Sequence, residues 1–479
     1  MKDFLNLYRH GFVRMAVATP VVRVGDPAHN AAGTEALMRE AARAKAALVV
    51  FPELGLTAYT CDDLFHQQTI IDGAADALAG LLRRTRNLPV AALVGLPVTV
   101  DGLLYNCAAL LCQGRLVGVV PKTYIPNYRE FYERRQFTPA DSCQRKEIEL
   151  AGQTTAFGND LIFRCRDLPQ FVLHVEICED LWVPAPLSSF AALAGATVTA
   201  NLSASNVVIG KHGYRYQLGA NQSARCIGAY LYSAAGLGES TTDLAWDGDA
   251  MVFENGNLLA ESRRFANEPQ IALADVDLGR LLADRMRQTT FGDSARRHAA
   301  EVARFRMLEF SVPVPKGNLL LERKIEKLPY VPSDPATRDA RCEEVYRIQV
   351  NGLVTRMRAT GTKKLIIGVS GGLDSTQALI VCAKAMDELK LPRANVLAFT
   401  MPGFATSSRT KNQAWQLMRA VGATAEEIDI KPSCMQMLKD LGHPFAKGKK
   451  VYDKRQTLRE RQDKREADRA MGTQRNLGD

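Results

Sequence analysis

Three residues of different chemical type each follow an apolar run in the first part of the chain. They are Glu53, Lys122 and Cys178. A cysteine attacks as the thiolate and needs a base, and the oxyanion formed by its attack needs a cation or N–H donors. If the three runs are strands of one sheet, their ends meet at one edge. The residue types then predict covalent catalysis, with Cys178 as nucleophile, Glu53 as base and Lys122 at the oxyanion.

Each of the three also has an ordinary interpretation when taken alone: a helix N-terminal acid, a solvated loop lysine and a buried thiol. No serine–histidine–aspartate arrangement competes with them, because no histidine accompanies a G-x-S-x-G sequence.

A second set of reactive groups lies in residues 365–375, LIIGVSGGLDS. An apolar run breaks into glycines and resumes as a helical pattern from Ser375. Glycines let the backbone aim several N–H groups at one point, and a helix N-terminus adds partial positive charge. The pattern predicts a phosphate cradle, with an ordinary glycine-rich turn as the alternative. It is not a Walker A loop, because Asp374 stands where that motif has lysine.

The elements that must position these residues form two α/β parts. Up to about residue 300, buried strands alternate with helices and hairpins, with hairpin turns predicted at Gln113-Gly114 and Asn255-Gly256. A second part begins near residue 337 and alternates helices with strands, among them 365–369. This alternation predicts a parallel sheet with ligands at the carboxyl ends of its strands.

Composition narrows the function classes. The chain has 479 residues, 46% of them hydrophobic, and a net charge of +9, which suits anionic small substrates as well as nucleic acid. No apolar run is long enough to span a bilayer, and the N-terminus lacks a signal peptide. The ten cysteines show no metal-ligand spacing. We therefore expect reduced thiols in a cytoplasmic protein, with no membrane, nucleic acid or permanently bound metal as partner.

The two sets of residues resemble two known sites. SGGLDS resembles the pyrophosphate loop of ATP pyrophosphatases, and Glu53, Lys122 and Cys178 resemble the Glu-Lys-Cys triad of the nitrilase/amidase superfamily. In such a triad the cysteine attacks a carboxamide, ammonia leaves a thioester behind, and water activated by the glutamate releases the acid. Residues 123–137, rich in aromatic and charged side chains, could stack nucleic-acid bases. Their position directly after Lys122 favours a lid over the amidase pocket instead.

Together the two sites resemble those of the bacterial glutamine-dependent NAD synthetase family over residues 1 to about 453. The matching segments are FPELGLTAYTCDDLF, PKTYIPNYREFYERRQF, ICEDLW, NLSASN, GESTTDLAWDG, IIGVSGGLDSTQAL, MPGFATS and HPFAKGKKVYD. The resemblance implies that the first domain hydrolyses glutamine and passes ammonia through an internal tunnel. The second would adenylate deamido-NAD with Mg²⁺ and ATP, and ammonia would displace AMP to give NAD, in a homo-oligomer.

The resemblance also assigns binding residues. Tyr128, Ser205 and Lys211 match glutamine-binding positions, although many relatives have arginine at the last. A lysine there would pair with the carboxylate of the substrate. The ATP loop comprises Gly368, Val369, Ser370, Gly371, Gly372, Leu373, Asp374 and Ser375.

The implied fold class is α/β. We expect a nitrilase-like αββα sandwich at 1–300, a proline-spaced linker at 301–335, and a partial synthetase domain at 336–453. That domain would have the Rossmann-like parallel sheet of adenine nucleotide alpha-hydrolases. Residues 454–479 are highly charged and are expected to be disordered.

One departure from the family pattern keeps two functions open. After about Asp453 the family sequence does not continue, so we expect a truncated or frameshifted version. The chain is then either a complete glutamine-hydrolysing NAD synthetase, or a glutaminase or amidase with a non-functional nucleotide module. An RNA-binding protein driven by its positive charge is a third class, and it predicts salt-dependent binding of RNA.

Overall fold

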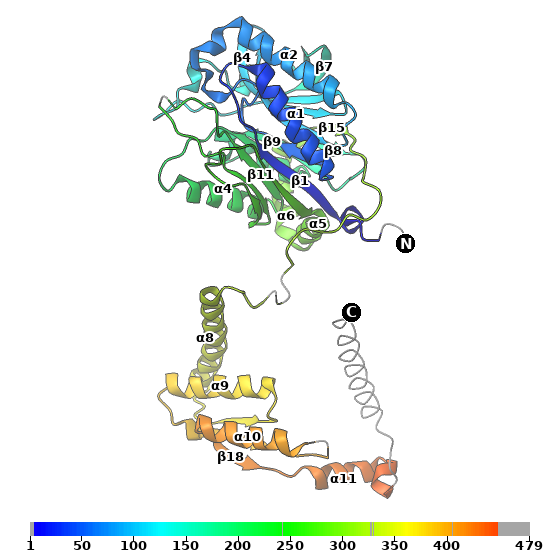
Figure 1. The fold of residues 1–479 in the computed structure, drawn as a ribbon. Coiled ribbons are helices and arrows are strands. Elements are labelled where there is room, and N and C mark those ends of the chain that lie inside the picture. The colour runs from blue at the N-terminus through cyan, green and yellow to red at the C-terminus, as the bar shows by residue number, and fades with distance from the viewer. Residues whose placement is uncertain (1–3, 242, 326–327, 329, 405, 449–479) are drawn as a thin grey trace, which may run out of the picture. The chain divides into compact units, whose positions relative to one another are not determined.

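The computed structural model describes residues 4–448, apart from 242, 326, 327, 329 and 405. The charged tail expected at 454–479 lies outside these residues. The chain divides after Ile325 into two compact units, which are described separately (Figure 1).

The first unit contains two sheets. One sheet has the order β14-β1-β2-β3-β4-β5-β7-β6 and the other β13-β12-β11-β10-β9-β8-β15. The strands of the first sheet are β1 (Phe12–Thr19), β2 (Leu48–Val50), β3 (Ala91–Val100), β4 (Leu103–Cys112), β5 (Arg115–Pro121), β6 (Glu147–Leu150), β7 (Gln153–Phe157) and β14 (Gln270–Asp277). Those of the second are β8 (Leu161–Cys165), β9 (Val172–Ile177), β10 (Val198–Ser203), β11 (Ala229–Ala234), β12 (Ala250–Glu254), β13 (Asn257–Glu261) and β15 (Arg306–Phe310).

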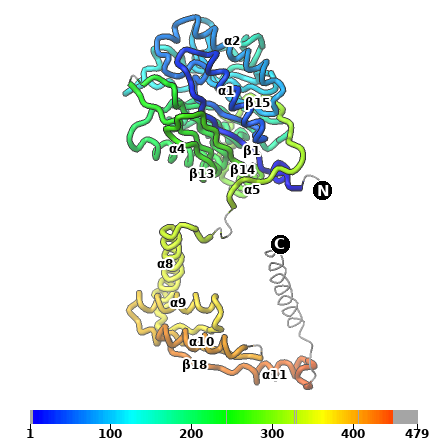
Figure 2. The backbone as a smooth tube through the Cα atoms, in the orientation of Figure 1, coloured from blue at the N-terminus to red at the C-terminus, as the bar shows by residue number. Residues whose placement is uncertain are grey.

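The helices of this unit are α1 (Pro27–Arg43), α2 (Gln68–Thr85), α3 (Leu187–Leu193), α4 (Lys211–Arg225), α5 (Leu278–Arg287), α6 (Thr289–Arg297) and α7 (Ala299–Ala303). Of these helices, α1 and α2 pack on the first sheet and α3 and α4 on the second, α5 packs into the core between the sheets, and α6 and α7 pack against other helices. One apolar core lies between the sheets, and another joins the first sheet to α1 and α2. The tube in Figure 2 shows α1 and α2 on one side of the unit and α4 on the other. The expected αββα sandwich is confirmed.

Both predicted hairpins are present. β4 and β5 pair antiparallel around Gln113 and Gly114, and β12 and β13 pair around Asn255 and Gly256. All four turn residues have positive φ, between 45° and 84°, as the two-residue turns that match the twist of the strands require.

The stretch expected to link the domains contributes structure to the first unit. β15 pairs in parallel with β8 and closes the edge of the second sheet. Beyond it, Asn6 donates to the carbonyl of Pro315, and the guanidinium of Arg14 contacts Glu322 at 2.9 Å. These contacts tie residues 315–322 to the start of the chain because Arg14 is buried and needs acceptors.

The second unit contains a three-stranded sheet. Its strands are β16 (Leu365–Gly368), β17 (Val396–Thr400) and β18 (Thr424–Glu427), and its helices are α8 (Pro335–Thr360), α9 (Leu373–Glu388), α10 (Ser408–Val421) and α11 (Lys431–Asp440). Both strand pairs are parallel, as the alternation of strands and helices predicts. The short 3-10 helices of the two units are η1 (Leu7–His10), η2 (Tyr59–His66), η3 (Glu133–Arg135), η4 (Ala140–Ser142), η5 (Cys178–Leu181), η6 (Arg393–Asn395) and η7 (Pro444–Lys447). Within residues 4–448, no helix has the length and apolar character to cross a membrane.

Candidate active site and nucleotide loop

The three residues predicted to do covalent chemistry all lie buried at the ends of strands. Glu53 follows β2, Lys122 follows β5 and Cys178 follows β9. Their exposed fractions are 1%, 0% and 6%. The strand ends come from two sheets and not from one, because β9 belongs to the second sheet. The one-sheet expectation was therefore wrong, since a sandwich lets a strand end of the facing sheet reach the same place.

Lys122 is held between two carboxylates. Its Nζ lies 2.7 Å from Oε1 of Glu53, and 2.8 and 2.7 Å from the two oxygens of Glu133. Burial alone would lower the pKa of Lys122, but Glu133 and then Glu53 raise it well above its usual value. The lysine is therefore an ammonium ion in a site that excludes water.

Glu133 is a site residue that sequence reasoning missed. It begins η3 inside the expected lid, is 5% exposed, and accepts a hydrogen bond of 2.9 Å from the hydroxyl of Tyr59. Burial raises its pKa, and the charge of Lys122 opposes that rise. The signal was available, because a lysine buried by a lid needs a second acidic partner. The run YREFYERR hid it among exposed charges.

Glu53 keeps one carboxylate oxygen without a partner. Oε1 accepts from Lys122 and from Nδ2 of Asn106 at 2.6 Å. Oε2 is buried and has no hydrogen-bond partner among the described residues. The loop that carries Glu53 packs against Gly95 of β3, where a Cβ would come within 2.3 Å of the nitrogen of Leu54. The carboxylate is thus fixed through one oxygen and able to accept a proton on the other.

Cys178 has an unusual backbone conformation. It is the first residue of η5, and its φ of 44° lies in the left-handed region that L-residues rarely adopt. Burial and the charge of Glu53 raise the pKa of its thiol, while Lys122 lowers it. The resting group is therefore a neutral thiol. It becomes a nucleophile when a base removes its proton.

Asp180 links the lysine loop to the cysteine turn. Its carboxylate accepts from the backbone N–H groups of Ile177 at 3.0 Å, Thr123 at 3.1 Å and Tyr124 at 2.8 Å. Burial raises the pKa of Asp180 to about 7, and the hydrogen bonds from Ile177 and Tyr124 limit that rise. The residues after Lys122 and those around Cys178 therefore keep a fixed spacing.

The three expected glutamine-binding residues differ in their contacts. The hydroxyl of Tyr128 donates to Glu179, the residue after the cysteine, at 2.7 Å, and Nζ of Lys211 donates to Asn206. Lys211 begins α4 and lies over the rings of Phe131 and Trp182, 5.3 and 5.4 Å from their centroids. Ser205 is buried, and its Oγ has no partner within the described part of the chain.

Beside these groups is a cavity that opens to the surface. Its lining includes Tyr59, Phe131, Glu133 and Leu244. It therefore lies between the expected lid and the carboxylate that holds Lys122.

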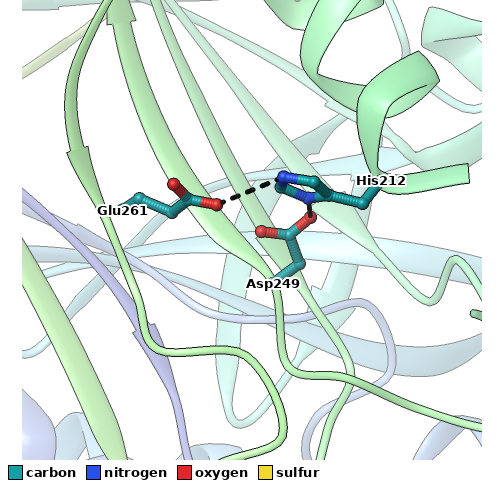
Figure 3. A group of neighbouring side chains, drawn as sticks. All are labelled: His212, Asp249 and Glu261. Atoms are coloured by element: carbon teal, nitrogen blue, oxygen red, sulfur yellow. Dashed lines mark hydrogen bonds and ion pairs between the residues drawn. The ribbon is translucent and has the colours of Figure 1, made fainter. Parts of the chain in front are cut away.

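One group in the described residues has metal-ligand types, namely His212, Asp249 and Glu261 (Figure 3). Nδ1 of His212 lies 3.0 Å from Asp249, and Nε2 lies 3.6 Å from Glu261. The two carboxylates thus face opposite nitrogens of the ring, and Asp249 also pairs with Arg215 at 3.4 Å. The arrangement suits an ion-pair cluster that fixes the first turn of α4 better than a metal site.

The SGGLDS loop joins β16 to α9 and is largely exposed. The hydroxyls of Ser370 and Ser375 are 3.2 Å apart, and the N–H of Gly372 donates to Ser370 Oγ at 3.3 Å. Gly371 has a φ of 80°, and a Cβ there would lie 2.4 Å from the carbonyl oxygen of Thr410. Hydroxyls, backbone N–H groups and the start of a helix therefore converge at one exposed point.

Comparison with known proteins matches the two units to two families. The carbon-nitrogen hydrolase family model matches residues 13–286, and the NAD synthase model matches residues 345–463. The chain is 49% identical over 451 residues to a glutamine-dependent NAD(+) synthetase from Mycobacterium tuberculosis and 48% identical to one from Mycobacterium leprae. Each match covers 94% of this chain and 66% of the relative.

More distant proteins carry the same description. An Aquifex aeolicus relative is 29% identical, over 81% of this chain and 60% of its own length. A solved glutamine-dependent NAD(+) synthetase from Cytophaga hutchinsonii is 19% identical, with a TM-score of 0.49, over 90% of this chain and 68% of that one. The chain thus spans about two thirds of the length of its mycobacterial relatives. It belongs to the carbon-nitrogen hydrolase family, with a second segment of NAD synthase type.

Proposed function

We propose that this chain is a glutamine-hydrolysing NAD synthetase. Glutamine hydrolysis in the first unit supplies ammonia, and the second unit uses ATP with Mg²⁺ to amidate deamido-NAD through an adenylate. The proposal is supported by matches to both family models and by the names of the mycobacterial relatives.

In the proposed first half-reaction, Oε2 of Glu53 accepts the thiol proton of Cys178 as Sγ bonds to the carboxamide carbon of glutamine. The ammonium of Lys122 stabilises the negative charge that develops on the amide oxygen. The C–N bond then breaks, Glu53 returns the proton to the nitrogen, and ammonia leaves a thioester. Water next gives a proton to Glu53 and attacks the thioester, and glutamate leaves as the thiol is restored.

A single observation carries this mechanism: the buried Oε2 of Glu53 has no partner among the described residues, while its Oε1 is held by Lys122 and Asn106. One oxygen therefore orients the carboxylate, and the other is left to take the proton in the proposed step. Around it, Tyr128, Ser205 and Lys211 would hold the amino-acid end of glutamine.

For the second half-reaction we propose that Gly368, Val369, Ser370, Gly371, Gly372, Leu373, Asp374 and Ser375 bind the phosphates of ATP. The loop lies at the carboxyl end of β16 and the start of α9, a placement that favours an anion. The exposed Asp374 is a hard oxygen ligand of the kind that suits Mg²⁺ bound with ATP.

A second candidate function is a glutaminase whose nucleotide module does not complete the synthesis of NAD. It is favoured by the exposure of large apolar side chains beside the loop: Ile366 is 75% and Leu373 is 87% exposed. Such side chains normally pack against a further surface.

The experiment is to incubate the full chain with glutamine, deamido-NAD and Mg²⁺–ATP, and to measure glutamate and NAD. Formation of both products supports the synthetase. Formation of glutamate without NAD supports the second candidate function, a glutaminase. In a parallel reaction, Cys178→Ala with ammonium chloride in place of glutamine should still form NAD. Retained glutamine hydrolysis in that variant would defeat the assignment of the nucleophile.

We also propose a cytoplasmic location and a homo-oligomer, as the family resemblance implies. The location is supported by the cysteines, all ten of which are free thiols. Disulfides are rare where thiols are kept reduced. Size-exclusion chromatography with light scattering tests the oligomer.

A further inference from the structure

We propose that Asn201 is a positioning residue, whose side chain holds the backbone of Cys178 in its left-handed conformation and thereby directs Sγ at Glu53. The inference rests on the proposed role of Cys178 as nucleophile. Asn201 belongs to β10, the neighbour of β9, and is paired in register with Glu176, two residues before the cysteine.

The conformation of Cys178 has to be maintained by its surroundings. A φ of 44° is unfavourable for an L-residue because Cβ crowds the backbone carbonyl. A residue keeps such a strained backbone conformation only where surrounding groups hold it in place. Strained residues of this kind are concentrated at functional sites. Without such a restraint Cys178 would relax to an ordinary φ, and its side chain would turn with it.

Asn201 supplies that restraint through both of its amide atoms. Oδ1 accepts from the backbone N–H of Cys178 at 3.1 Å, and Nδ2 donates to the carbonyl of the same residue at 3.4 Å. The side chain is fully buried. Asp180 acts on the neighbouring N–H, that of Ile177, so Asn201 is the described side chain that holds the peptide groups on both sides of the cysteine Cα.

The orientation of the amide is itself fixed. Ser203 Oγ donates to Oδ1 of Asn201 at 2.8 Å, so this oxygen accepts two hydrogen bonds. A flipped amide would turn its NH₂ toward the N–H of Cys178, and two donors would then meet in a buried site. Beside it, the buried carboxylate of Glu176 accepts from the hydroxyl of Tyr230, and burial raises the pKa of that carboxyl. The amide of Asn201 therefore lies in a buried polar network, which fixes its orientation toward Cys178.

The consequence for chemistry is geometric. The reacting atoms must be held close together and aligned, and a displacement of about 1 Å costs about 100-fold in rate. The hydrogen bonds of Asn201 within the described residues go to the backbone of Cys178 and to Ser203, so its loss should slow the chemical step and leave substrate binding almost unchanged.

The test compares Asn201→Leu, which keeps a similar volume, with Thr197→Val. Thr197 is a matched control: it is buried just before β10 and also bonds to the backbone around β9, accepting from Val172 at 3.1 Å, but at the opposite end of that strand. For Asn201→Leu we expect kcat for glutamine hydrolysis to fall about 100-fold with KM within about threefold. For Thr197→Val both should stay within about threefold, and thermal melts followed by circular dichroism report the stability of each variant.

A second readout does not depend on glutamine. Alkylation of Cys178 by iodoacetamide, followed by mass spectrometry of its peptide, is measured with and without Glu53→Gln. If Asn201 places Sγ at Glu53, then Glu53→Gln slows alkylation in the wild-type and Thr197→Val proteins but adds nothing in Asn201→Leu. Additive effects of Asn201→Leu and Glu53→Gln would overturn the proposal, as would equal changes in Asn201→Leu and Thr197→Val.

Two further outcomes are also decisive. If Asn201→Leu does not fold, Ser203→Ala replaces it, because it removes the hydroxyl that fixes the amide; it should lower kcat several-fold at constant KM, and an unchanged kcat would overturn the proposal. A wild-type protein that produces no glutamate but still shows the coupling between Asn201 and Glu53 would refute the proposed function and leave the positioning role intact.

Discussion

The two candidate sites of this chain differ in how their polar groups are held. Around Cys178 the charged groups are buried and bonded to one another, with Lys122 between two carboxylates and Asp180 on three backbone N–H groups. In the SGGLDS loop, Ser370 and Ser375 are bonded mainly to each other and to their own loop, and most of the loop is exposed. The groups of the first site are thus fixed by one another, whereas those of the second remain exposed on their loop.

The difference fits the two kinds of chemistry proposed for these sites. A thiol attacks only after a base has removed its proton, and the base and a cation for the oxyanion must stand at fixed places in a buried site, which costs desolvation and must be compensated by pairing. A phosphate brings its own charge and its own acceptors. A loop at the start of a helix can therefore stay hydrated until the ligand arrives.

The largest effect is expected from breaking the buried charge cluster. Lys122→Met leaves Glu53 and Glu133 facing each other without a cation, so the free energy of unfolding should fall by about 3–5 kcal/mol. Urea denaturation of the first unit measures it. Adding Glu133→Gln should restore part of the loss because it removes one uncompensated charge. A Lys122→Met protein as stable as the wild type would show that the cluster is hydrated.

A buried histidine should make the first unit sensitive to acid. Burial lowers the pKa of His174 to about 4 from 6.5. Below pH 6.5 the histidine is therefore protonated in the unfolded chain, whereas in the folded chain it is protonated only near pH 4. Stability from this group is present above pH 6.5 and is lost as the pH falls toward 4, by about 3 kcal/mol.

His174→Gln should flatten that part of the pH profile of unfolding, measured by urea midpoints between pH 4 and 7. His66→Gln is the control, because His66 is exposed. Equal slopes in the wild-type protein and in His174→Gln would contradict the assignment.

Glu133→Gln sharpens the comparison within the active site. It keeps the shape of the side chain but removes the carboxylate that holds Lys122 with two oxygens, so kcat for glutamine hydrolysis should fall about 10- to 100-fold. Asp63→Asn is the matched control in the same region, because Asp63 forms an exposed ion pair with Arg135. Solvent screens that pair, so its loss should leave kcat unchanged. If kcat of Glu133→Gln equals that of the wild type, Glu133 does not contribute to catalysis through Lys122.

The smallest effect on stability is expected in the nucleotide loop. Gly371→Ala places a Cβ 2.4 Å from the carbonyl oxygen of Thr410, at a φ of 80°. It should cost about 1–3 kcal/mol in the second unit and abolish ATP binding measured by calorimetry, while glutamine hydrolysis stays unchanged. Gly352→Ala in α8 is the control, because a Cβ there would meet no atom within 4 Å and the residue lies outside the loop. ATP binding by Gly371→Ala that equals that of Gly352→Ala and the wild type would contradict a role of the loop in nucleotide binding.

The amino-acid sequence by itself determined the alternation of strands and helices, the two hairpins and the residue types of both sites, but it missed β15 in the expected linker. Strand and turn patterns are local, so Gln113-Gly114 and the glycines of SGGLDS could be interpreted without the fold. Family resemblance supplied the sandwich and the pairing of two domains.

Only the tertiary structure decided which groups meet. It brought Cys178 from the facing sheet, placed Glu133 on Lys122, left Oε2 of Glu53 without a partner in the described part of the chain, and set Asn201 against the backbone of Cys178. The physical reason is that buried charge and backbone strain are balanced by residues far away in the chain. The sequence shows which residues are charged or nucleophilic, and the packing of the two sheets determines which residues compensate their burial and backbone strain.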